Sequence, residues 1–388
     1  MSVPMLMLKE LGTIHTGSTP KTNDDSLFGG HVPFVTPGDL DAVSPIQSTS
    51  RTLTEAGVKT ADLLPAESVL VCCIGSLGKI GFAGKPVVTN QQINAVVFNP
   101  AKVHARYGFF ACRMLKPQLE LMAPATTVPI VNKSRFSELR IPVPPLEEQR
   151  RIAAILDQAE TLRTQRRQAL AHLDTLTQSL FLDMFGDPMA NPKGWSFVKL
   201  DQLIREGDTI NYGVIQPGDA LDEGVPLVRV GDVVDGNFDP SSLKRIDPTI
   251  EAAYKRSRLR GDEILVTCVG SIGVVALVDT SMRGFNIARA VSRIPASDRV
   301  NRVFLASYLQ TEHVQRYFTS ELRTVSQPTL NIKQICETKV IQPPIALQQT
   351  FATRIQAIEA LKATHRTALA QLDALFASLQ QRAFAGEL

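Results

Sequence analysis

The chain has 388 residues, of which 44% are hydrophobic and 20% are charged, and it carries a net charge of +3 with a pI near 8.6. These values are typical of a globular protein with two or three domains, and they exclude a basic charge spread over the whole surface. No apolar run approaches the ~20 residues that cross a bilayer, and the N-terminus lacks the basic flank and apolar stretch of a signal peptide.

The first segment alternates short β-branched runs with Gly, Pro, Asn and Asp, which predicts strands joined by turns, with helix near Arg106–Leu115. Pro144-Pro145 ends this segment, because proline cannot continue a strand ladder, and a long helix follows. A third segment repeats the pattern of the first, with helix near Val303–Tyr317, and a fourth repeats the long helix. We expect an α+β chain made of residues 1–145, 146–186, 187–344 and 345–388.

The chain repeats itself. Between Arg167–Leu180 and Arg366–Leu379, nine of fourteen positions are identical at a constant offset of 199, where chance would give about one match. Upstream, Val69–Gly78 corresponds to Ile264–Gly273 with a small shift in offset. A period this long indicates a tandem duplication of a globular domain plus a long helix, and not a solenoid.

Both long helices carry apolar residues at alternating spacings of three and four, the pattern of a coiled-coil seam. We expect them to pair as an antiparallel coiled coil, although an amphipathic core helix would show the same pattern. The predicted seam residues are Ile152, Ile155, Ala159, Leu162, Arg166, Ala169, Leu173, Leu176 and Leu180, and Phe351, Arg354, Ile358, Leu361, His365, Ala368, Leu372, Leu375 and Leu379. A centred register would bring the two polar members, Arg166 and His365, together and fix the pairing, because a slip would bury them unpaired.

Motifs that mark catalysis are missing from the sequence. It contains no Asn- or Asp-Pro-Pro-aromatic motif for amino methylation, no G-x-G-x-x-G fingerprint and no H-E-x-x-H helix, and Gly78-Lys79 lacks the Ser or Thr of a Walker loop. The five cysteines form no C-x-x-C pair and the six histidines are scattered, which fits a reducing cytoplasm. We expect a cytoplasmic protein that is not an enzyme and holds no metal or cofactor.

The segment Ile141–Leu162, IPVPPLEEQRRIAAILDQAETL, resembles the signature that ends each target-recognition domain in the specificity (S) subunits of Type I restriction–modification systems. The G-S-T-P run at Gly17, the T-P-G-D-L run at Thr36 and the strand and turn of Ile264–Gly273 are similar too. The duplicated layout extends this resemblance over the whole chain. The second copy departs from the pattern where its helix begins, at Ile345–Gln349.

The resemblance implies that each target-recognition domain reads one half of a split, asymmetric site on double-stranded DNA. The paired helices would serve as a ruler and as the docking surface for two methyltransferase (M) subunits, which bind S-adenosylmethionine and methylate adenine. Restriction (R) subunits would add translocation and cleavage driven by ATP, with Mg. A helix of about 38 residues spans roughly 57 Å, and half-sites read from one face lie about one helical turn apart.

Phosphate contacts need Lys, Arg or hydroxyl groups, and base reading needs Arg, Lys, Asn or Gln at groove depth. In the first domain we expect these contacts from Lys21, Thr36, Lys79, Asn90, Gln91 and Lys133. In the second we expect them from Arg229, Ser271, Asn286, Arg289 and Arg293, with Tyr212 as an apolar or stacking contact. The cationic stretch Lys244, Arg245, Lys255, Arg256, Arg258 and Arg260 is assigned to phosphates. For each residue, a solvated surface position is the alternative interpretation.

Two Gly-Ser-x-Gly turns, Gly75–Gly78 and Gly270–Gly273, admit two roles. Their N–H groups could cradle a phosphate, or their glycines could simply permit a tight turn after a buried strand, which we favour. Three other functions remain open: a duplicated coiled-coil scaffold that binds proteins, the specificity subunit of a related methylation-only defence system, and a self-contained enzyme. A protein scaffold would lack DNA affinity that falls steeply with salt.

Overall fold

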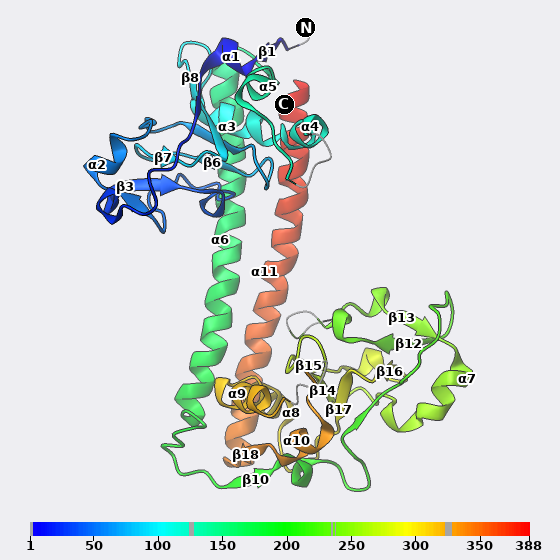
Figure 1. The fold of residues 1–388 in the computed structure, drawn as a ribbon. Helices are drawn as coiled ribbons and strands as arrows, with labels where there is room; N and C mark the ends of the chain where they lie inside the picture. The colour runs from blue at the N-terminus through cyan, green and yellow to red at the C-terminus, as the bar shows by residue number, and fades with distance from the viewer. Residues whose placement is uncertain (1–2, 124–127, 234–235, 237, 323–327) are drawn as a thin grey trace. The chain divides into compact units, whose positions relative to one another are not determined.

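The computed structural model describes residues 3–123, 128–233, 236, 238–322 and 328–388. The chain divides into two compact units, Met1–Gln168 with Arg366–Leu388, and Ala169–His365. Each unit holds one globular domain together with one half of each long helix, α6 (Leu146–Phe185) and α11 (Ile345–Ala385) (Figure 1). The division therefore runs across both helices, because each helix half packs with the domain of its own unit.

The globular part of the first unit is built from short strands and helices. In chain order these are β1 (Met5–Met7), α1 (Leu8–Leu11), β2 (Gly12–Thr16), η1 (Asp25–Leu27), β3 (Phe28–Val35), η2 (Pro37–Asp39), β4 (Thr52–Leu53), α2 (Glu55–Val58), β5 (Val69–Cys72), β6 (Ile80–Phe82), β7 (Val88–Thr89), β8 (Ile93–Phe98), α3 (Ala105–Arg113), α4 (Lys116–Met122), α5 (Lys133–Ser137) and β9 (Arg140–Pro142). The strands form three sheets, with orders β2-β8-β5-β6, β4-β3-β7 and β1-β9.

The second unit repeats this plan. Its elements are β10 (Phe197–Lys199), η3 (Leu200–Leu203), β11 (Asn211–Tyr212), β12 (Val225–Val228), η4 (Val230–Asp232), η5 (Pro240–Ser242), β13 (Lys244–Ile246), α7 (Pro248–Glu251), η6 (Ala252–Ser257), β14 (Ile264–Thr267), β15 (Val275–Leu277), η7 (Thr280–Met282), β16 (Asn286–Ile287), β17 (Val291–Ile294), α8 (Arg302–Leu309), α9 (Glu312–Ser320), α10 (Ile332–Glu337) and β18 (Lys339–Ile341). Its sheets, β11-β17-β14-β15, β13-β12-β16 and β10-β18, match those of the first unit strand for strand.

The predicted α+β class and tandem duplication are confirmed. In both three-stranded sheets the middle strand pairs antiparallel with one neighbour and parallel with the other. The helix predicted near Arg106–Leu115 is present as α3. The stretch predicted near Val303–Tyr317 is two helices, because α8 ends at Leu309 and Thr311 is the N-cap residue of α9.

Aromatic side chains anchor the helix halves to the domains. In the first unit, Phe376 of α11 lies 6.3 Å from Phe110 of α3 between ring centroids. In the second unit, Phe185 of α6 and Phe351 of α11 both pack against Phe304 of α8, at 4.7 and 6.5 Å. Buried rings of this size remove about 150–250 Å² each from water, so they hold helix and domain together as one core.

Within each unit the helix halves run antiparallel and are joined by an ion cluster of the same design. The two helix-pair ion clusters are Glu160, Arg163 and Asp373 in the first unit and Glu359, Lys362 and Asp174 in the second. The Arg163 guanidinium lies 2.6 Å from the Asp373 carboxylate, and the Lys362 ammonium lies 2.9 Å from that of Asp174. Both cations are largely buried, so each must keep its carboxylate partners, and this requirement sets the register.

The predicted seam is wrong by one residue in the middle of the helices. Four leucines predicted there remain 42–50% exposed: Leu162, Leu176, Leu361 and Leu375. The residues that follow them make the contacts between the helices: Arg163, Thr177, Lys362 and Phe376. Near the start of α11 the prediction holds, since Phe351 packs on Phe181 and Phe185 of α6. The apolar period marks a face that becomes covered, and near the helix ends the domain and the partner helix cover it together, as Phe351 shows by packing on Phe304 of α8 and on Phe185 of α6.

Arg166 and His365 belong to different units, on either side of the division between them. Their predicted pairing therefore stays a prediction. Polar groups that the structure does place between the helix halves of one unit include Arg163, Arg167 and Lys362.

A buried glutamine joins the first turn of each long helix to its domain. Gln149 donates to the carbonyl oxygens of Lys102 and Pro144, at 3.0 and 2.8 Å, and accepts from the His104 N–H at 2.8 Å. Gln348, at the same place in the repeat, donates to the Pro343 carbonyl and accepts from the Asn301 N–H. Each glutamine satisfies backbone groups that would otherwise be buried without partners.

We expect Gln149→Ala to lower the free energy of unfolding by about 1–3 kcal/mol, because three backbone groups lose their partner. Urea denaturation of the purified chain measures this loss. Gln178→Ala is the matched control, since Gln178 is exposed on the same helix, and it should stay within ~0.5 kcal/mol of the unmodified protein. Equal stabilities for the two variants would show that the glutamine contacts do not hold helix to domain.

Candidate nucleic-acid interface

A tight crossing of two segments brings the predicted contact loops of each domain together. In the first domain the Ser18 N–H donates to the Thr89 carbonyl at 3.0 Å, and a Cβ added to Gly17 would lie 2.2 Å from the Asn90 oxygen. In the second domain the Val214 N–H donates to the Ile287 carbonyl at 2.7 Å, and a Cβ on Gly213 would lie 1.6 Å from that oxygen. Only glycine permits so close an approach, so both loops are held in place by backbone.

One of the predicted residues of the first domain, Gln91, lies at this crossing, and a second, Lys21, follows it closely in the crossing loop. Gln91 is exposed and its amide oxygen accepts a hydrogen bond from the Thr19 hydroxyl, while Lys21 is exposed two residues beyond Thr19. Thr36 and Asn90 lie near but have local roles. The Thr36 hydroxyl and N–H both donate to Asp39, and the buried Asn90 side chain bonds Gln92. Lys21 and Gln91 therefore remain predicted DNA contacts, whereas the side chains of Thr36 and Asn90 bond within the fold.

Lys79 and Lys133 lie elsewhere in the first domain. Lys79 follows the Gly75–Gly78 turn, with its ammonium 3.6 Å from the Asp41 carboxylate, and Lys133 begins α5 in an exposed position. No contact in the described part of the chain joins either to Gln91. They remain predicted phosphate contacts, with the charge of Lys79 partly offset by Asp41.

The Gly-Ser-x-Gly turn of the first domain serves to form a tight turn after a buried strand, and not to bind phosphate. Gly75 and Gly78 have φ of 77° and 76°, and the N–H groups of Gly75, Leu77 and Gly78 donate to carbonyl oxygens of the chain itself. A turn whose donors are already satisfied offers little to a phosphate. The corresponding glycines of the second domain have φ of 76° and 80°, so that turn is built in the same way, with Ser271 exposed at its tip.

The second domain presents a basic segment that runs from Lys255 to Arg260. Lys255 and Arg256 are exposed, and no ion pair joins either of them to another described residue. Asn211 of β11 donates to the Arg256 carbonyl and Asn286 of β16 to the Tyr254 carbonyl, both at 3.1 Å. These bonds hold the segment against the two strands that form the crossing.

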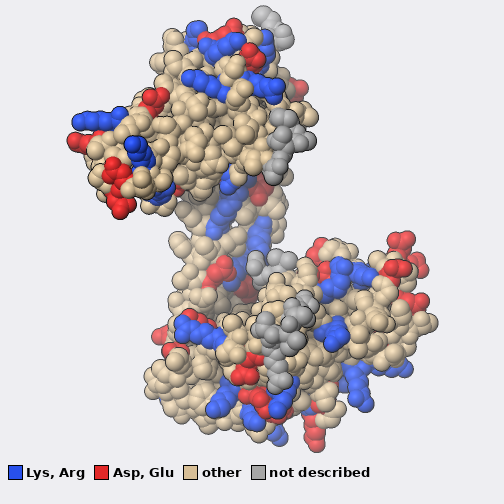
Figure 2. Space-filling model, in the orientation of Figure 1, with Lys and Arg blue, Asp and Glu red and all other residues tan. Residues whose placement is uncertain are grey.

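Other cations of the second domain already have partners. Arg229, Arg258 and Arg260 lie 2.8, 2.5 and 3.7 Å from the carboxylates of Asp232, Glu251 and Asp208. The hydrogen bond from Arg258 lowers the pKa of Glu251, so this carboxylate stays charged at neutral pH. Lys244 and Arg245 donate to the carbonyl oxygens of Gly218 and Gly224. On the face drawn in Figure 2, basic and acidic side chains are likewise interspersed.

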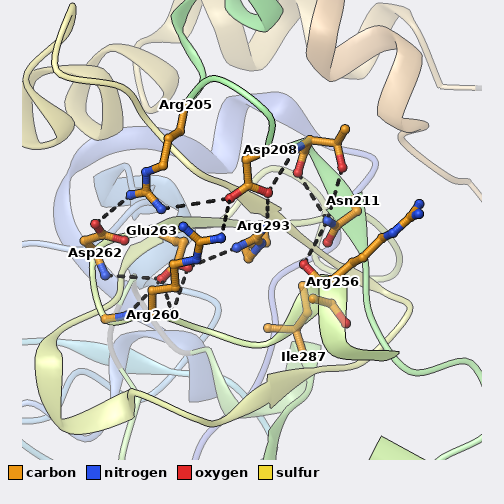
Figure 3. A network of polar contacts seen from close by, with 12 residues as sticks. Arg205, Asp208, Asn211, Arg256, Arg260, Asp262, Glu263, Ile287 and Arg293 are labelled. Carbon is orange, nitrogen blue, oxygen red and sulfur yellow. Dashed lines mark hydrogen bonds and ion pairs between the residues drawn. The ribbon is translucent and has the colours of Figure 1, made fainter. Parts of the chain in front are cut away.

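Arg293 and Asn286, both predicted to contact DNA, lie inside the second domain, and we correct their assignment. Arg293 is 2% exposed on β17, and its guanidinium bonds Asp208 and Glu263, the latter at 3.1 Å (Figure 3). Glu263 also accepts from three backbone N–H groups. Asn286 is fully buried and bonds Ser257 and Glu251. A cation this deep is stable only because these partners surround it, and it has no surface to offer a base.

Tyr212 and Arg289 lie beside the crossing of the second domain. The Tyr212 hydroxyl donates to the Leu330 carbonyl at 2.8 Å, so its polar end faces inward, and this burial raises its pKa to about 12. Arg289 is exposed, and its N–H donates to the Val214 carbonyl at 2.9 Å. Together with Arg256 and Lys255, Arg289 forms the exposed cationic set nearest the crossing.

The pattern of the sequence missed Thr19 and the two buried glutamines. Thr19 is part of the G-S-T-P run, but its contact with Gln91 bridges residues 72 positions apart.

Within the described ranges, no group of three or more His, Cys, Asp or Glu could hold a metal ion, and no helix is long and apolar enough to cross a membrane.

The chain is similar to proteins of one kind. The family described as Type I restriction modification DNA specificity domain matches residues 4–172 and 192–374. The Type I restriction enzyme EcoBI specificity subunit of Escherichia coli is 28% identical over 352 residues, covering 83% of this chain and 74% of that protein. The MjaIX specificity subunit of Methanocaldococcus jannaschii is 24% identical over 372 residues, covering 90% and 85%. The crystal structure of a Type I restriction-modification S subunit from M. genitalium aligns over 98% of this chain and 96% of that one, with a TM-score of 0.63 and 16% identity.

A domain duplicated together with its long helix, with one match to the DNA specificity domain in each copy, defines a two-domain DNA specificity subunit. The family match covers most of the chain in two consecutive blocks, one for each copy. The chain belongs to the family of Type I restriction–modification DNA specificity subunits.

We expect Lys255→Ala combined with Arg256→Ala to weaken DNA binding at every sequence and to flatten its salt dependence. Loss of two phosphate contacts should reduce the slope of log K against log salt by about 2, since each contact contributes roughly 0.9. Fluorescence anisotropy over a salt series, with the chain assembled with its methyltransferase subunits, measures the slope. Arg316→Ala is the control, because Arg316 is exposed on α9 and paired with Glu312 at 2.5 Å. An unchanged slope in the double variant would remove the segment from the interface.

Proposed function

We propose that this chain reads a bipartite, asymmetric DNA site, one half with each domain. The observation that carries this proposal is that two domains of identical sheet order present different side chains at equivalent loops. The first offers Gln91 and Lys21 at its crossing, and the second offers Arg289 with Lys255 and Arg256. Different side chains on one framework recognise different bases, so the two half-sites need not be related by symmetry.

The chemistry of the complex is assigned to other subunits. We propose that methyltransferase subunits bind S-adenosylmethionine and methylate adenine, and that restriction subunits use ATP and Mg. This chain would then be the non-catalytic member that chooses the DNA sequence. The absence of catalytic motifs from the sequence supports this division of roles.

The exposed leucines of the helix pair supply a docking surface for two methyltransferase subunits. Each unit carries one such leucine on α6 and one on α11: Leu162 with Leu375, and Leu176 with Leu361. Each of these leucines lies one residue before a residue that contacts the other helix. It therefore points roughly 100° around the helix axis from that contact. Because the helices are antiparallel, both leucines of a unit turn to the same side of the pair. Two equivalent apolar strips suit two copies of one partner, and apolar surface left bare in this way marks an interaction site.

Methylome sequencing of the native host and of a strain lacking this chain tests the proposed function. We expect N6-methyladenine to disappear from one bipartite motif, and only from that motif, in the deletion strain. Restoring the chain should restore the methylation. An unchanged methylome, under conditions where the chain is expressed, would contradict the proposal and favour a protein scaffold.

For the docking strips, we expect Leu162→Asp combined with Leu375→Asp to change the stoichiometry of the purified complex from two methyltransferase subunits to one. A charge in a desolvated apolar contact costs several kcal/mol, while the strip of the other unit remains intact. Native mass spectrometry reads the stoichiometry directly. Leu121→Asp is the control, because Leu121 is 86% exposed on α4 and belongs to neither long helix, and it should leave two copies bound. Two copies on the double variant would place the docking surface elsewhere.

A further inference from the structure

The two domains share one exposed turn at which they differ. In the first domain Asn90 donates its N–H to the Val35 carbonyl at 3.0 Å, and its own carbonyl accepts from the Ile93 N–H at 3.1 Å. In the second, Ala288 donates to the Val228 carbonyl and accepts from the Val291 N–H, both at 2.9 Å. The backbone pattern is the same, so Asn90–Ile93 and Ala288–Val291 are equivalent β-turns. Their second residues are Gln91 and Arg289.

This turn is more firmly placed than a surface loop usually is. It joins the three-stranded sheet to the four-stranded sheet in both domains, since β7 and β16 precede it and β8 and β17 follow it. The glycine crossing packs against it, with backbone hydrogen bonds from Ser18 in the first domain and Val214 in the second. A side chain that reads a base must be held to within a fraction of an ångström, and a fixed backbone provides that.

The side chains at the second position are exposed and chemically matched to base edges. A glutamine amide pairs bidentately with N6 and N7 of adenine, and an arginine guanidinium with O6 and N7 of guanine. Gln91 has one hydrogen bond, from Thr19, which orients its amide. No ion pair ties Arg289 to any described residue, whereas Arg293, four residues on, is buried against carboxylates. Of these two arginines of the second domain, only Arg289 can therefore reach a groove.

Cations flank the turn in both domains. Lys21 follows the loop that bonds Gln91, and Arg256 is tied through its carbonyl to Asn211, two residues before the Gly213 crossing. A base reader between phosphate contacts is the usual arrangement of a specific interface. We propose that the second residue of this turn is a base-reading position in each domain, with Gln91 contacting an adenine in one half-site and Arg289 a guanine in the other. The proposal rests on the proposed function and names where within each domain the reading occurs.

A coupling experiment tests the guanine contact. Once the methylated motif is known, each guanine of both half-sites is replaced in turn by 7-deazaguanine, which lacks the N7 acceptor. Binding of the complex with its methyltransferase subunits is measured for the unmodified chain and for Arg289→Ala. We expect one 7-deaza substitution, in a single half-site, to weaken binding of the unmodified complex about tenfold and to have no further effect on Arg289→Ala. If no guanine shows this coupling, the assignment of Arg289 is overturned.

The reciprocal variant tests the position independently of Arg289. Gln91→Arg should change the preferred base from adenine to guanine at one position of the other half-site, seen as an altered motif in the methylome. Arg283→Gln, an exposed arginine of the second domain outside the turn, should leave the motif unchanged. If Gln91→Arg methylates the original motif, the proposal for the first domain is overturned. If Gln91→Arg loses all methylation, Gln91→Ala decides: full retention of the original motif in Gln91→Ala also overturns the proposal. Failure of the proposed function itself would look different, because the unmodified chain would then direct no bipartite methylation at all.

Discussion

The helix-pair ion clusters are the constraint on which the rest of each unit depends. In both, a largely buried cation on one helix is held by a carboxylate on its own helix and by another on the antiparallel helix. Removing a carboxylate partner leaves a largely buried cation less well compensated, at a cost below the ~3–5 kcal/mol of a fully buried pair because the Asp373 and Asp174 side chains are 43% and 66% exposed. A slip of either helix would break these ion pairs and would also separate Phe351 from Phe181 and Phe185, so charge and apolar packing together set the register of the helix halves. This leaves the leucines of the same helices uncovered and available to partners.

Each domain is attached to its helix halves by contacts that do not involve the exposed loops of the domain. Buried rings and one glutamine make the attachment, and none of these groups belongs to the loops at the crossing. Recognition residues can therefore change without loosening the domain from the helices. The two domains also differ at a buried position of the four-stranded sheet. Arg293 on β17 lies opposite Leu265 in the second domain, where the first domain has Ala95 opposite Leu70. The buried charge there is supported by Glu263 and Asp208, which the first domain does not need.

The balance of charge on the surface suits a subunit that works within a complex. Six of the twelve arginines that the structure describes in the second domain pair with carboxylates, so pairing removes about half of the arginine charge that the free chain could offer to phosphates. Few phosphate contacts mean modest affinity on their own and little non-specific binding. In the proposed complex, partner subunits that bind the duplex would supply the remaining affinity, and the turns carrying Gln91 and Arg289 would supply the choice of sequence.

The sequence by itself determined the duplication, the α+β class, the two long helices and the family, because identity at a constant offset and apolar periodicity survive without knowledge of contacts. It also placed Gln91, Arg289, Lys255 and Arg256 among the candidates for DNA contact. Only the tertiary structure decided which face of each helix meets its partner, since periodicity marks an apolar face but not what covers it. Only the structure showed that Arg289 is exposed and Arg293 is buried, although the two lie four residues apart. Arg293 lies on a paired strand and is bonded by carboxylates of residues 30 and 85 positions away, which the local sequence does not reveal.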